Sequence, residues 1–274
     1  MSNFRTKLRI CLTEPRKLGF FMGEKKWKTL IQLFLVLLIA LTPYLIKTSL
    51  ITEISSSSKS YLETILMTEN INEDIKIIDG KLIGDETISV VLEEGIIFIN
   101  PLNQTLVNDE YKYLPIYNFH TDGVTISLLD VVLSELTYEE LGYLNIDFNK
   151  IFDSNYIEYY NFVGLINDSF SHIKAYLVTL NFLSMLVVGY LSLILSASII
   201  ALFGGMTNKL IAYRFRFKGA LDAQFISVLF IFLAYLFNIQ PLEYVGTAFS
   251  IIYFMRGLMS IVRIEVKRIK KEEQ

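Results

Sequence analysis

The sequence is poor in the residues from which catalytic and metal sites are usually built. Cys11 is the only cysteine, so no disulfide can form within the chain and a zinc site made of thiolates is excluded. The two histidines, His120 and His172, are far apart, and a pairing of His120 with Asp122 falls short of the three or four ligands that a metal needs. No zinc-protease, nucleophile-elbow, phosphate-loop or dinucleotide-binding motif occurs. We therefore predict a non-enzymatic protein without a cofactor.

Charge is distributed very unevenly along the chain. Residues 51–174 hold 21 of the 28 acidic residues but 6 of the 25 basic ones, a net charge of −15. Residues 1–28 hold eight basic and two acidic residues, a net charge of +6. The overall charge of −3 therefore averages over two compartments, and it gives no reason to expect a nucleic-acid partner.

Four long apolar runs separate these charged segments. About 20 apolar residues, each rising 1.5 Å along a helix, cross a hydrocarbon core of about 30 Å. Trp27 lies before the first run, where an interfacial indole is expected, and Lys47 follows it. This first run and its basic lead are too long for a cleaved signal peptide, so we interpret the run as an anchor. The predicted spans are residues 28–48, 176–206, 223–239 and 244–264.

The orientation follows from the lysines and arginines beside the spans. They gather in a basic, amphipathic segment (residues 1–27), a loop (207–222) and a tail (265–274). Basic flanks favour the cytoplasmic side, so both termini are predicted to be cytoplasmic and residues 49–174 extracytoplasmic. An outer segment without cysteine is typical of a bacterial cell envelope. We expect a multi-pass protein whose surroundings are the lipid bilayer of a bacterial plasma membrane.

The outer segment, residues 49–174, has the length of one small domain. Its strand and helix signals together predict an α+β fold. Asp79-Gly80 between two short apolar runs indicates a β-hairpin. The capping-box pattern at 137–140 predicts a helix that continues to residue 144. The acidic charge of the domain either attracts a ligand or partner, or serves only solubility and topology. The expected strands are residues 75–78, 81–83, 87–92 and 95–100.

Small residues recur on one face of two predicted spans. Such residues let helices approach closely, so these faces are expected to pack within the chain or against a partner. The positions are Gly246, Ser250 and Gly257 in the fourth span, and Gly189, Ser192 and Ser196 in the second.

Arg256 is the one charge well inside a predicted span, and its insertion costs on the order of 2.5–3.5 kcal/mol. No acidic residue lies within the other predicted spans to pair with it. We expect its side chain to point into the bundle and to contact a partner or anionic lipid. The alternative is that it snorkels towards the cytoplasmic surface.

Three stretches carry a resemblance to a known family. They are LTEPRKLGFFMGEKKWKTLIQLFLVLLIALTPYL, EDIKIIDGKLIGDETISVVLEEGIIFINP and the last three spans. Nearly the whole chain is similar to a domain-of-unknown-function family of four-span bacterial membrane proteins, some of which are named maltodextrin utilisation proteins. The resemblance implies an extracytoplasmic domain and a link to sugar uptake, and it supplies no catalytic residue.

We therefore predict a membrane α-helical protein with four transmembrane helices and a small α+β extracytoplasmic domain between the first two. Its predicted function is that of an accessory or sensory protein whose outer domain binds a ligand or partner, with an ABC transporter as one such partner. The sequence sets no oligomeric state. The alternative is a transporter component that forms part of the substrate path, which a polar groove containing Arg256 would favour.

Overall fold

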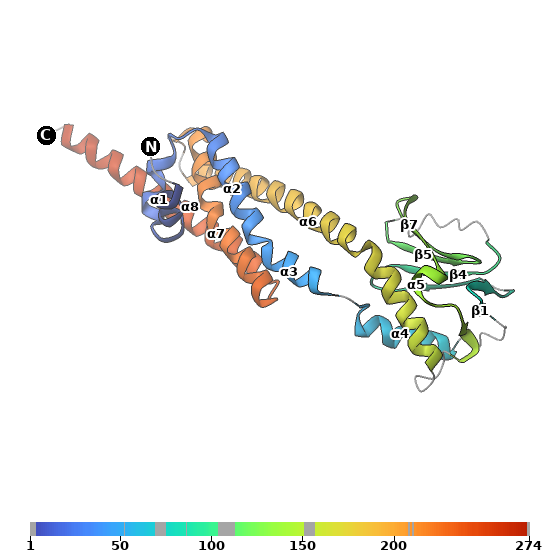
Figure 1. Ribbon diagram of the computed structural model, residues 1–274. Helices are drawn as coiled ribbons and strands as arrows, with labels where there is room; N and C mark the ends of the chain where they lie inside the picture. The colour runs from blue at the N-terminus through green and yellow to red at the C-terminus, as the bar shows by residue number, and fades with distance from the viewer. Residues whose placement is uncertain are drawn as a thin grey trace. The chain divides into compact units, whose positions relative to one another are not determined.

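The chain forms two compact units in a computed structural model (Figure 1). The helical unit comprises Met1–Thr48 and Thr179–Gln274, and the sheet unit comprises Ser49–Val178. Helix α6 (Ile157–Thr207) contributes to both. The structure describes residues 4–51, 53–68, 75–85, 87–103, 113–150, 157–207, 209 and 211–272.

Four helical stretches of the described chain are long and apolar enough to cross a membrane, as predicted. The first consists of α2 (Lys26–Ala40) and α3 (Thr42–Leu50), which a turn at Leu41 separates. Pro43 explains the interruption, because proline lacks the N–H that would continue the helical hydrogen bonding. The four stretches are Lys26–Leu50, Ile157–Thr207, Tyr213–Phe237 and Leu242–Ile261.

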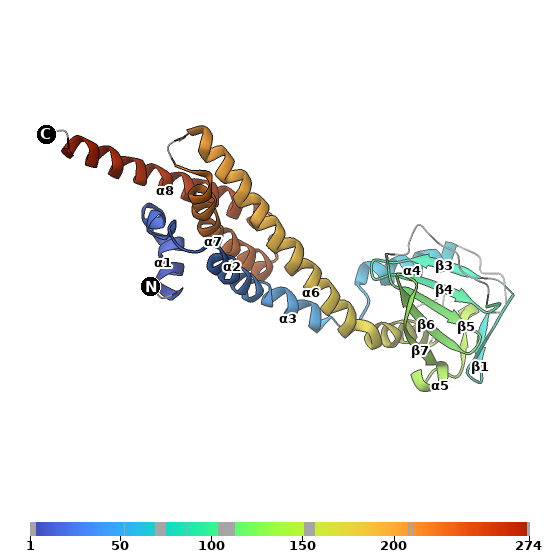
Figure 2. The same cartoon turned by 90° about the horizontal axis from the view of Figure 1, so that it is seen from above.

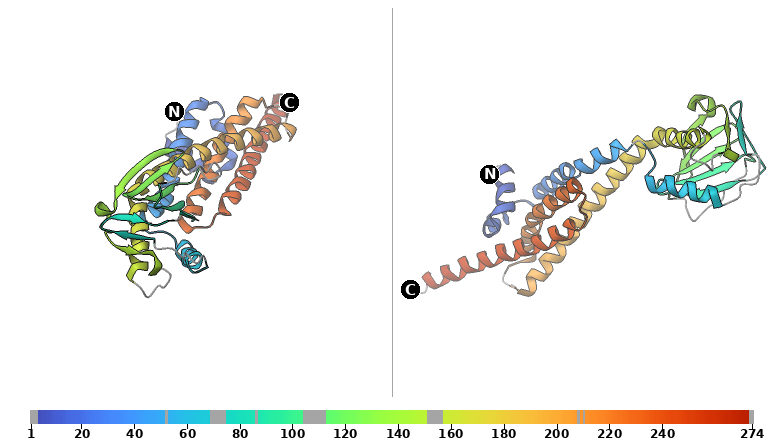
Figure 3. Two further views of the ribbon diagram at one scale, coloured as in Figure 1. Left: turned by 90° about the vertical axis from the view of Figure 1, so that its right-hand side faces the viewer. Right: turned by 90° about the horizontal axis from the view of Figure 1, so that it is seen from below.

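Helix α7 (Tyr213–Phe237) lies at the centre of the helical unit. It packs along α8 (Leu242–Glu272) and also contacts α2, α1 (Phe4–Thr13) and the 3₁₀-helix η1 (Pro15–Phe21). In the most apolar part of α7, 56% of the residues are buried, against 28% in the other three stretches. Both views in Figure 3 keep α7 and α8, in orange and red, side by side. Helices α8, α2, α1 and η1 are therefore arranged around α7.

The start of α7 differs from the prediction. Residues 213–222 were expected within a basic loop (207–222) and the span was expected over 223–239, but the helix begins at Tyr213. The segment contains no proline, and Lys218 and Asp222 pair one turn apart, so nothing interrupts the helix. The helix therefore starts ten residues before the predicted span.

The end of α7 forms the tight helical hairpin that was predicted. Asn238 adopts the left-handed conformation (φ 58°) and closes the helix, and Ile239 N–H donates to Ala234 O at 2.9 Å. Pro241 then precedes the first turn of α8, where a missing N–H costs no hydrogen bond.

The sheet unit contains a five-stranded sheet in the order β3-β4-β5-β6-β7 and a three-stranded sheet in the order β2-β1-β8 (Figure 2). All neighbouring strands are antiparallel except β4 and β5. The predicted hairpin at Asp79-Gly80 and the strands on either side are confirmed. The strands are β1 (Lys76–Ile78), β2 (Lys81–Ile83), β3 (Ile88–Val91), β4 (Ile96–Asn100), β5 (Ile116–His120), β6 (Gly123–Leu128), β7 (Val131–Thr137) and β8 (Ile146–Asp147).

Helices complete the core of the sheet unit. Helix α4 (Ser56–Thr68) and the first turns of α6 contribute Leu62 and Leu165, which are buried in one cluster with Phe119 of β5 and with Phe148 of the 3₁₀-helix η2 (Phe148–Lys150). Alternating apolar residues of the strands supply the other side of this cluster. The unit thus has its own core, as an α+β domain requires.

The predicted capping box is present at the start of α5 (Tyr138–Leu141). Thr137 Oγ1 accepts from Glu140 N–H at 3.2 Å, and a carboxylate oxygen of Glu140 accepts from Thr137 N–H at 2.8 Å. The helix is shorter than expected because Gly142, with φ 83°, ends it before residue 144.

Candidate functional site

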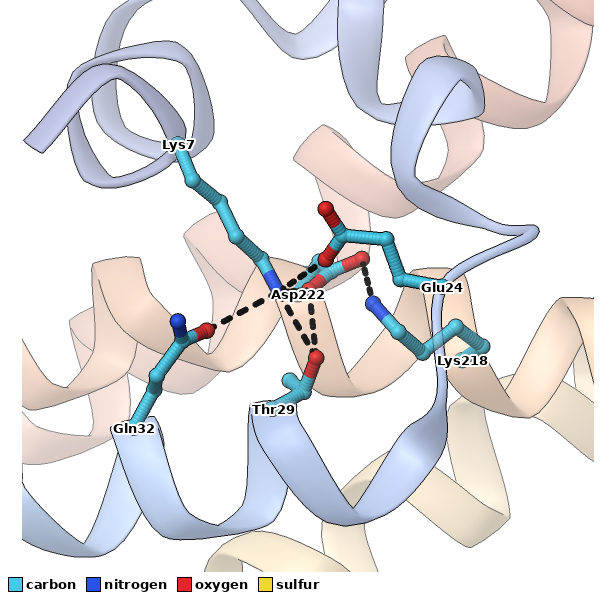
Figure 4. A network of polar contacts seen from close by, with 6 residues as sticks. All are labelled: Lys7, Glu24, Thr29, Gln32, Lys218 and Asp222. Atoms are coloured by element: carbon cyan, nitrogen blue, oxygen red, sulfur yellow. Dashed lines mark hydrogen bonds and ion pairs between the residues drawn. The ribbon is translucent and has the colours of Figure 1, made fainter. Parts of the chain in front are cut away.

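Four charged side chains meet inside the helical unit (Figure 4). Lys7 comes from α1, Glu24 from the segment between η1 and α2, and Lys218 and Asp222 from successive turns of α7. We call these four residues the charge network. The side chains of Lys7 and Lys218 are each 1% exposed and that of Asp222 is fully buried.

The carboxylate of Asp222 joins the two lysines. Lys7 Nζ lies 3.1 Å from Asp222 Oδ1 and 3.0 Å from Glu24 Oε2. Lys218 Nζ lies 2.5 Å from Asp222 Oδ2. Each oxygen of Asp222 therefore pairs with a different lysine, and one carboxylate connects α1 to α7.

Helix α2 adds uncharged partners to the network. Lys7 Nζ donates to Thr29 Oγ1 at 2.7 Å and to Gln32 Oε1 at 3.1 Å, and the Thr29 hydroxyl donates to Asp222 Oδ1 at 3.4 Å. The ammonium of Lys7 also lies 5.7 Å from the centre of the Phe21 ring, within cation–π range. Residues 4–24 are thereby held against α2 and α7.

The network is electrically balanced. Burial lowers the pKa of Lys7, but the nearby carboxylates of Asp222 and Glu24 outweigh this effect and raise the pKa above its ordinary value. Lys7 is therefore protonated at neutral pH, and two lysines face two carboxylates. A buried group of this kind is tolerated because every charge has a partner, whereas the removal of one partner is costly.

The N-terminal segment also buries the single cysteine beside this network. Cys11 lies one turn after Lys7 on α1 and has no exposed surface. Burial raises the pKa of the Cys11 thiol, so the thiol is protonated at neutral pH. Its position indicates that α1 belongs to the packed interior and is not a loose tail.

The ion pairs of the network connect α1, α7 and the segment before α2, which gives it a structural role. Within the described residues, no group of three or more His, Cys, Asp or Glu side chains is placed to hold a metal ion. Comparisons with protein-family models, curated proteins and solved structures find no match for this chain.

The charge network is the feature that the sequence analysis missed. The expectation that no acidic residue lies within another span is wrong, because Asp222 is buried in α7. Because Lys218 and Asp222 were assigned to a loop, their pairing within a helix was not predicted. Their spacing of four residues, in a stretch that contains no helix breaker, was the available signal.

Arg256 lies on the exposed face of α8, so the expectation that it points into the bundle is wrong. The buried face of this part of α8 is formed by Phe254, Gly257 and Leu258. At 100° per residue Arg256 lies opposite Phe254, away from the packed side. Its side chain therefore does not line a polar groove within the bundle.

The small residues of α8 pack against two neighbours. Ser250 is buried, donates to Ala223 O at 2.9 Å and lies 2.7 Å from Ser227 Oγ on α7. Gly246 approaches α7 so closely that a Cβ there would lie 2.7 Å from Phe230 Cβ and 3.1 Å from Ser227 Cα. One helical face thus allows α7 and α8 to approach closely.

Gly257 allows α8 to approach the N-terminal segment closely. A Cβ at this position would lie 3.0 Å from Pro15 O and 3.2 Å from Leu18 Cβ, both in η1. Tyr253, one turn earlier, donates its hydroxyl proton to Leu12 O at 2.8 Å. This part of α8 therefore holds the same segment as the charge network does.

The three small residues that were predicted to form one packing face of α6 have different surroundings in the structure. Gly189 packs beside α2, where a Cβ would lie 3.7 Å from Leu37, and Ser196 accepts from Gln224 Nε2 at 3.3 Å. Ser192 is exposed and contributes nothing to this packing.

We predict that Asp222→Asn lowers the free energy of unfolding by about 3 kcal/mol or more. The substitution removes the carboxylate that pairs with Lys218, and it leaves Lys7 with Glu24 as its one ion-pair partner. The double variant Lys218→Met/Asp222→Asn should be more stable than Asp222→Asn alone, since one unpaired charge is removed. The measurement is unfolding of the full chain in mild detergent by titration with sodium dodecyl sulfate.

The matched control removes an exposed ion pair of the same segment. Lys17 and Glu14 have side chains that are 51% and 33% exposed, so Lys17→Met should change stability by less than about 1 kcal/mol. Equal effects of Asp222→Asn and Lys17→Met would show that the buried network does not hold the fold.

Gly246→Ala should destabilise the helical unit by about 1–3 kcal/mol, because the added methyl group meets the backbone of Ser227. Gly189→Ala is the matched control: its methyl group has room, and alanine favours a helix, so stability should be unchanged or slightly higher. The same unfolding titration compares them, and an equal response would contradict the close α7–α8 contact.

Proposed function

We propose that the protein is a non-enzymatic accessory protein of a bacterial plasma membrane, whose extracytoplasmic sheet unit binds another protein. Four apolar helical stretches support a multi-pass arrangement. The basic residues beside these helices support cytoplasmic termini, and an outer location of the sheet unit follows from its place between the first two apolar stretches.

The observation that carries this proposal is an apolar hairpin tip on an acidic domain. Residues 129 and 130 form the turn between the paired strands β6 and β7, and residues 131 and 132 begin β7. We call these four residues the β6–β7 tip. Leu129 is 52% exposed, Val131 59% and Val132 52%. Large apolar side chains grouped on a charged surface are typical of an interaction site, because contact with a partner removes them from water.

The backbone explains why these side chains point outward. Leu129 and Asp130 both have positive φ (52° and 62°), as in a tight two-residue hairpin turn. A register shift between Ile126 and Ser127 then places an additional residue in β7. Such a bulge re-aims side chains, and here the neighbouring Val131 and Val132 are both exposed.

Strand β7 also ends its sheet. It pairs with β6 on one side, and the order of the described strands places no strand on the other. The edge strand of seven residues presents backbone groups that a partner strand could pair with. Apolar contacts at the tip and backbone pairing along the edge would then act together.

The identity of the partner follows from the sequence resemblance, which links such proteins to sugar uptake. On this basis we expect a transport complex, such as an ABC transporter of maltodextrins. The accessory role is preferred to a substrate path in the helical unit because the buried charges pair with each other and Arg256 lies on an exposed face.

The test is co-purification of the tagged full chain from its native membranes in mild detergent. We expect an envelope complex in stoichiometric amounts, and at least about tenfold less of it with Val131→Ser/Val132→Ser. The matched control is Ile83→Ser/Val91→Ser, which alters two exposed apolar residues elsewhere on the sheet unit and should retain the complex. Recovery of the wild-type chain alone, or retention of the partner by the tip variant, would contradict the proposal.

A further inference from the structure

A pocket of about 350 Å³ opens beside the charge network in the helical unit. One wall is formed by residues 22–25, which connect η1 to α2, and by Lys26, the first residue of α2. The other wall is the first turns of α7, with Arg214, Phe215 and Lys218. The volume is sufficient for a group of the size of a phosphate with its attached alcohol.

The charges around this pocket do not cancel. Of the five charged residues that line it, Glu24 is paired with Lys7, and Lys218 is paired with Asp222. No ion pair in the described part of the chain involves the other three, Lys25, Lys26 and Arg214. Three positive charges are therefore available to one ligand.

Aromatic rings lie within cation–π range of two of these cations. Lys26 Nζ lies 5.3 Å from the centre of the Phe217 ring, and the Arg214 guanidinium lies 4.7 Å from that of Phe215. The pocket also includes the start of the 25-residue helix α7, whose N-terminus has no side-chain cap. Uncapped N–H groups at a helix start favour anions.

We propose that this pocket binds the phosphate group of an anionic ligand, which is either a phospholipid headgroup or a small soluble phosphate compound. Lysine and arginine are the usual partners of phosphate. A phosphate dianion would neutralise two of the three positive charges, and a phosphodiester would neutralise one. The binding chemistry is independent of the proposed function. Its placement at the cytoplasmic surface of the bilayer rests on the topology proposed above.

Trp27 provides a direct probe. It is the only tryptophan, it is 56% exposed and it follows the pocket residue Lys26. The full chain, purified in a maltoside detergent, is titrated with dioctanoyl phosphatidylglycerol, dioctanoyl phosphatidylcholine and inorganic phosphate while Trp27 emission is followed. We expect saturable binding of the anionic lipid or of phosphate, and no saturable binding of the net-neutral lipid.

Matched variants separate the pocket from general charge attraction. Lys25→Gln/Arg214→Gln should weaken binding at least about tenfold, whereas Arg5→Gln/Arg9→Gln, which removes two exposed charges of α1 outside the pocket, should change it less than about twofold. Lys25→Arg/Arg214→Lys keeps both charges and should restore most of the affinity, which excludes misfolding as the cause.

The outcomes also distinguish the two sources of phosphate. Saturation by phosphatidylglycerol with no competition from inorganic phosphate supports a lipid headgroup, and saturation by inorganic phosphate supports a soluble ligand. Equal losses in the pocket and α1 variants, or no saturable binding of either probe, would overturn the proposal. Neither result depends on whether a partner protein is recovered in the co-purification.

Discussion

The carboxylate of Asp222 holds two buried lysines that come from distant parts of the sequence. Lys218 approaches it from the preceding turn of the same helix, and Lys7 from the N-terminal helix, 3.1 Å away. In a low-dielectric interior such charges must be neutralised, because an unpaired charge there costs several kcal/mol. The buried carboxylate of α7 therefore needs Lys7 of the N-terminal segment as a partner, and buried Lys7 needs that carboxylate.

Other features of the helical unit agree with this constraint. The close contact at Gly246 brings α8 against α7, and Gly257 and Tyr253 of α8 hold the same N-terminal residues that supply Lys7. The basic pocket lies beside the network and shares Glu24 and Lys218 with it. A segment held so firmly positions Lys25 and Lys26 for a ligand, while the separate sheet unit carries the apolar β6–β7 tip.

Much of the fold could be predicted because local signals agreed with the final structure. Asp79-Gly80 has few alternatives to a tight turn, and the Thr137–Glu140 pattern closes its own hydrogen bonds. The charge network could not be predicted in the same way, since it depends on side chains far apart in the sequence. In the sequence nothing distinguishes Lys7 from its basic neighbours, although the fold buries it. The exposure of Arg256 depends on the rotation of α8 about its axis, which the sequence does not specify.

The most direct test of this account is the reactivity of Cys11, which is the only cysteine and has no exposed surface. Maleimide labelling of the full chain in mild detergent should be slow at neutral pH and fast after denaturation, because the thiol is both enclosed and protonated. Asp222→Asn should raise the native labelling rate, and Lys17→Met should leave it low. Labelling of the native wild-type chain as fast as the denatured chain would contradict the claim that buried charges hold the N-terminal segment in the bundle.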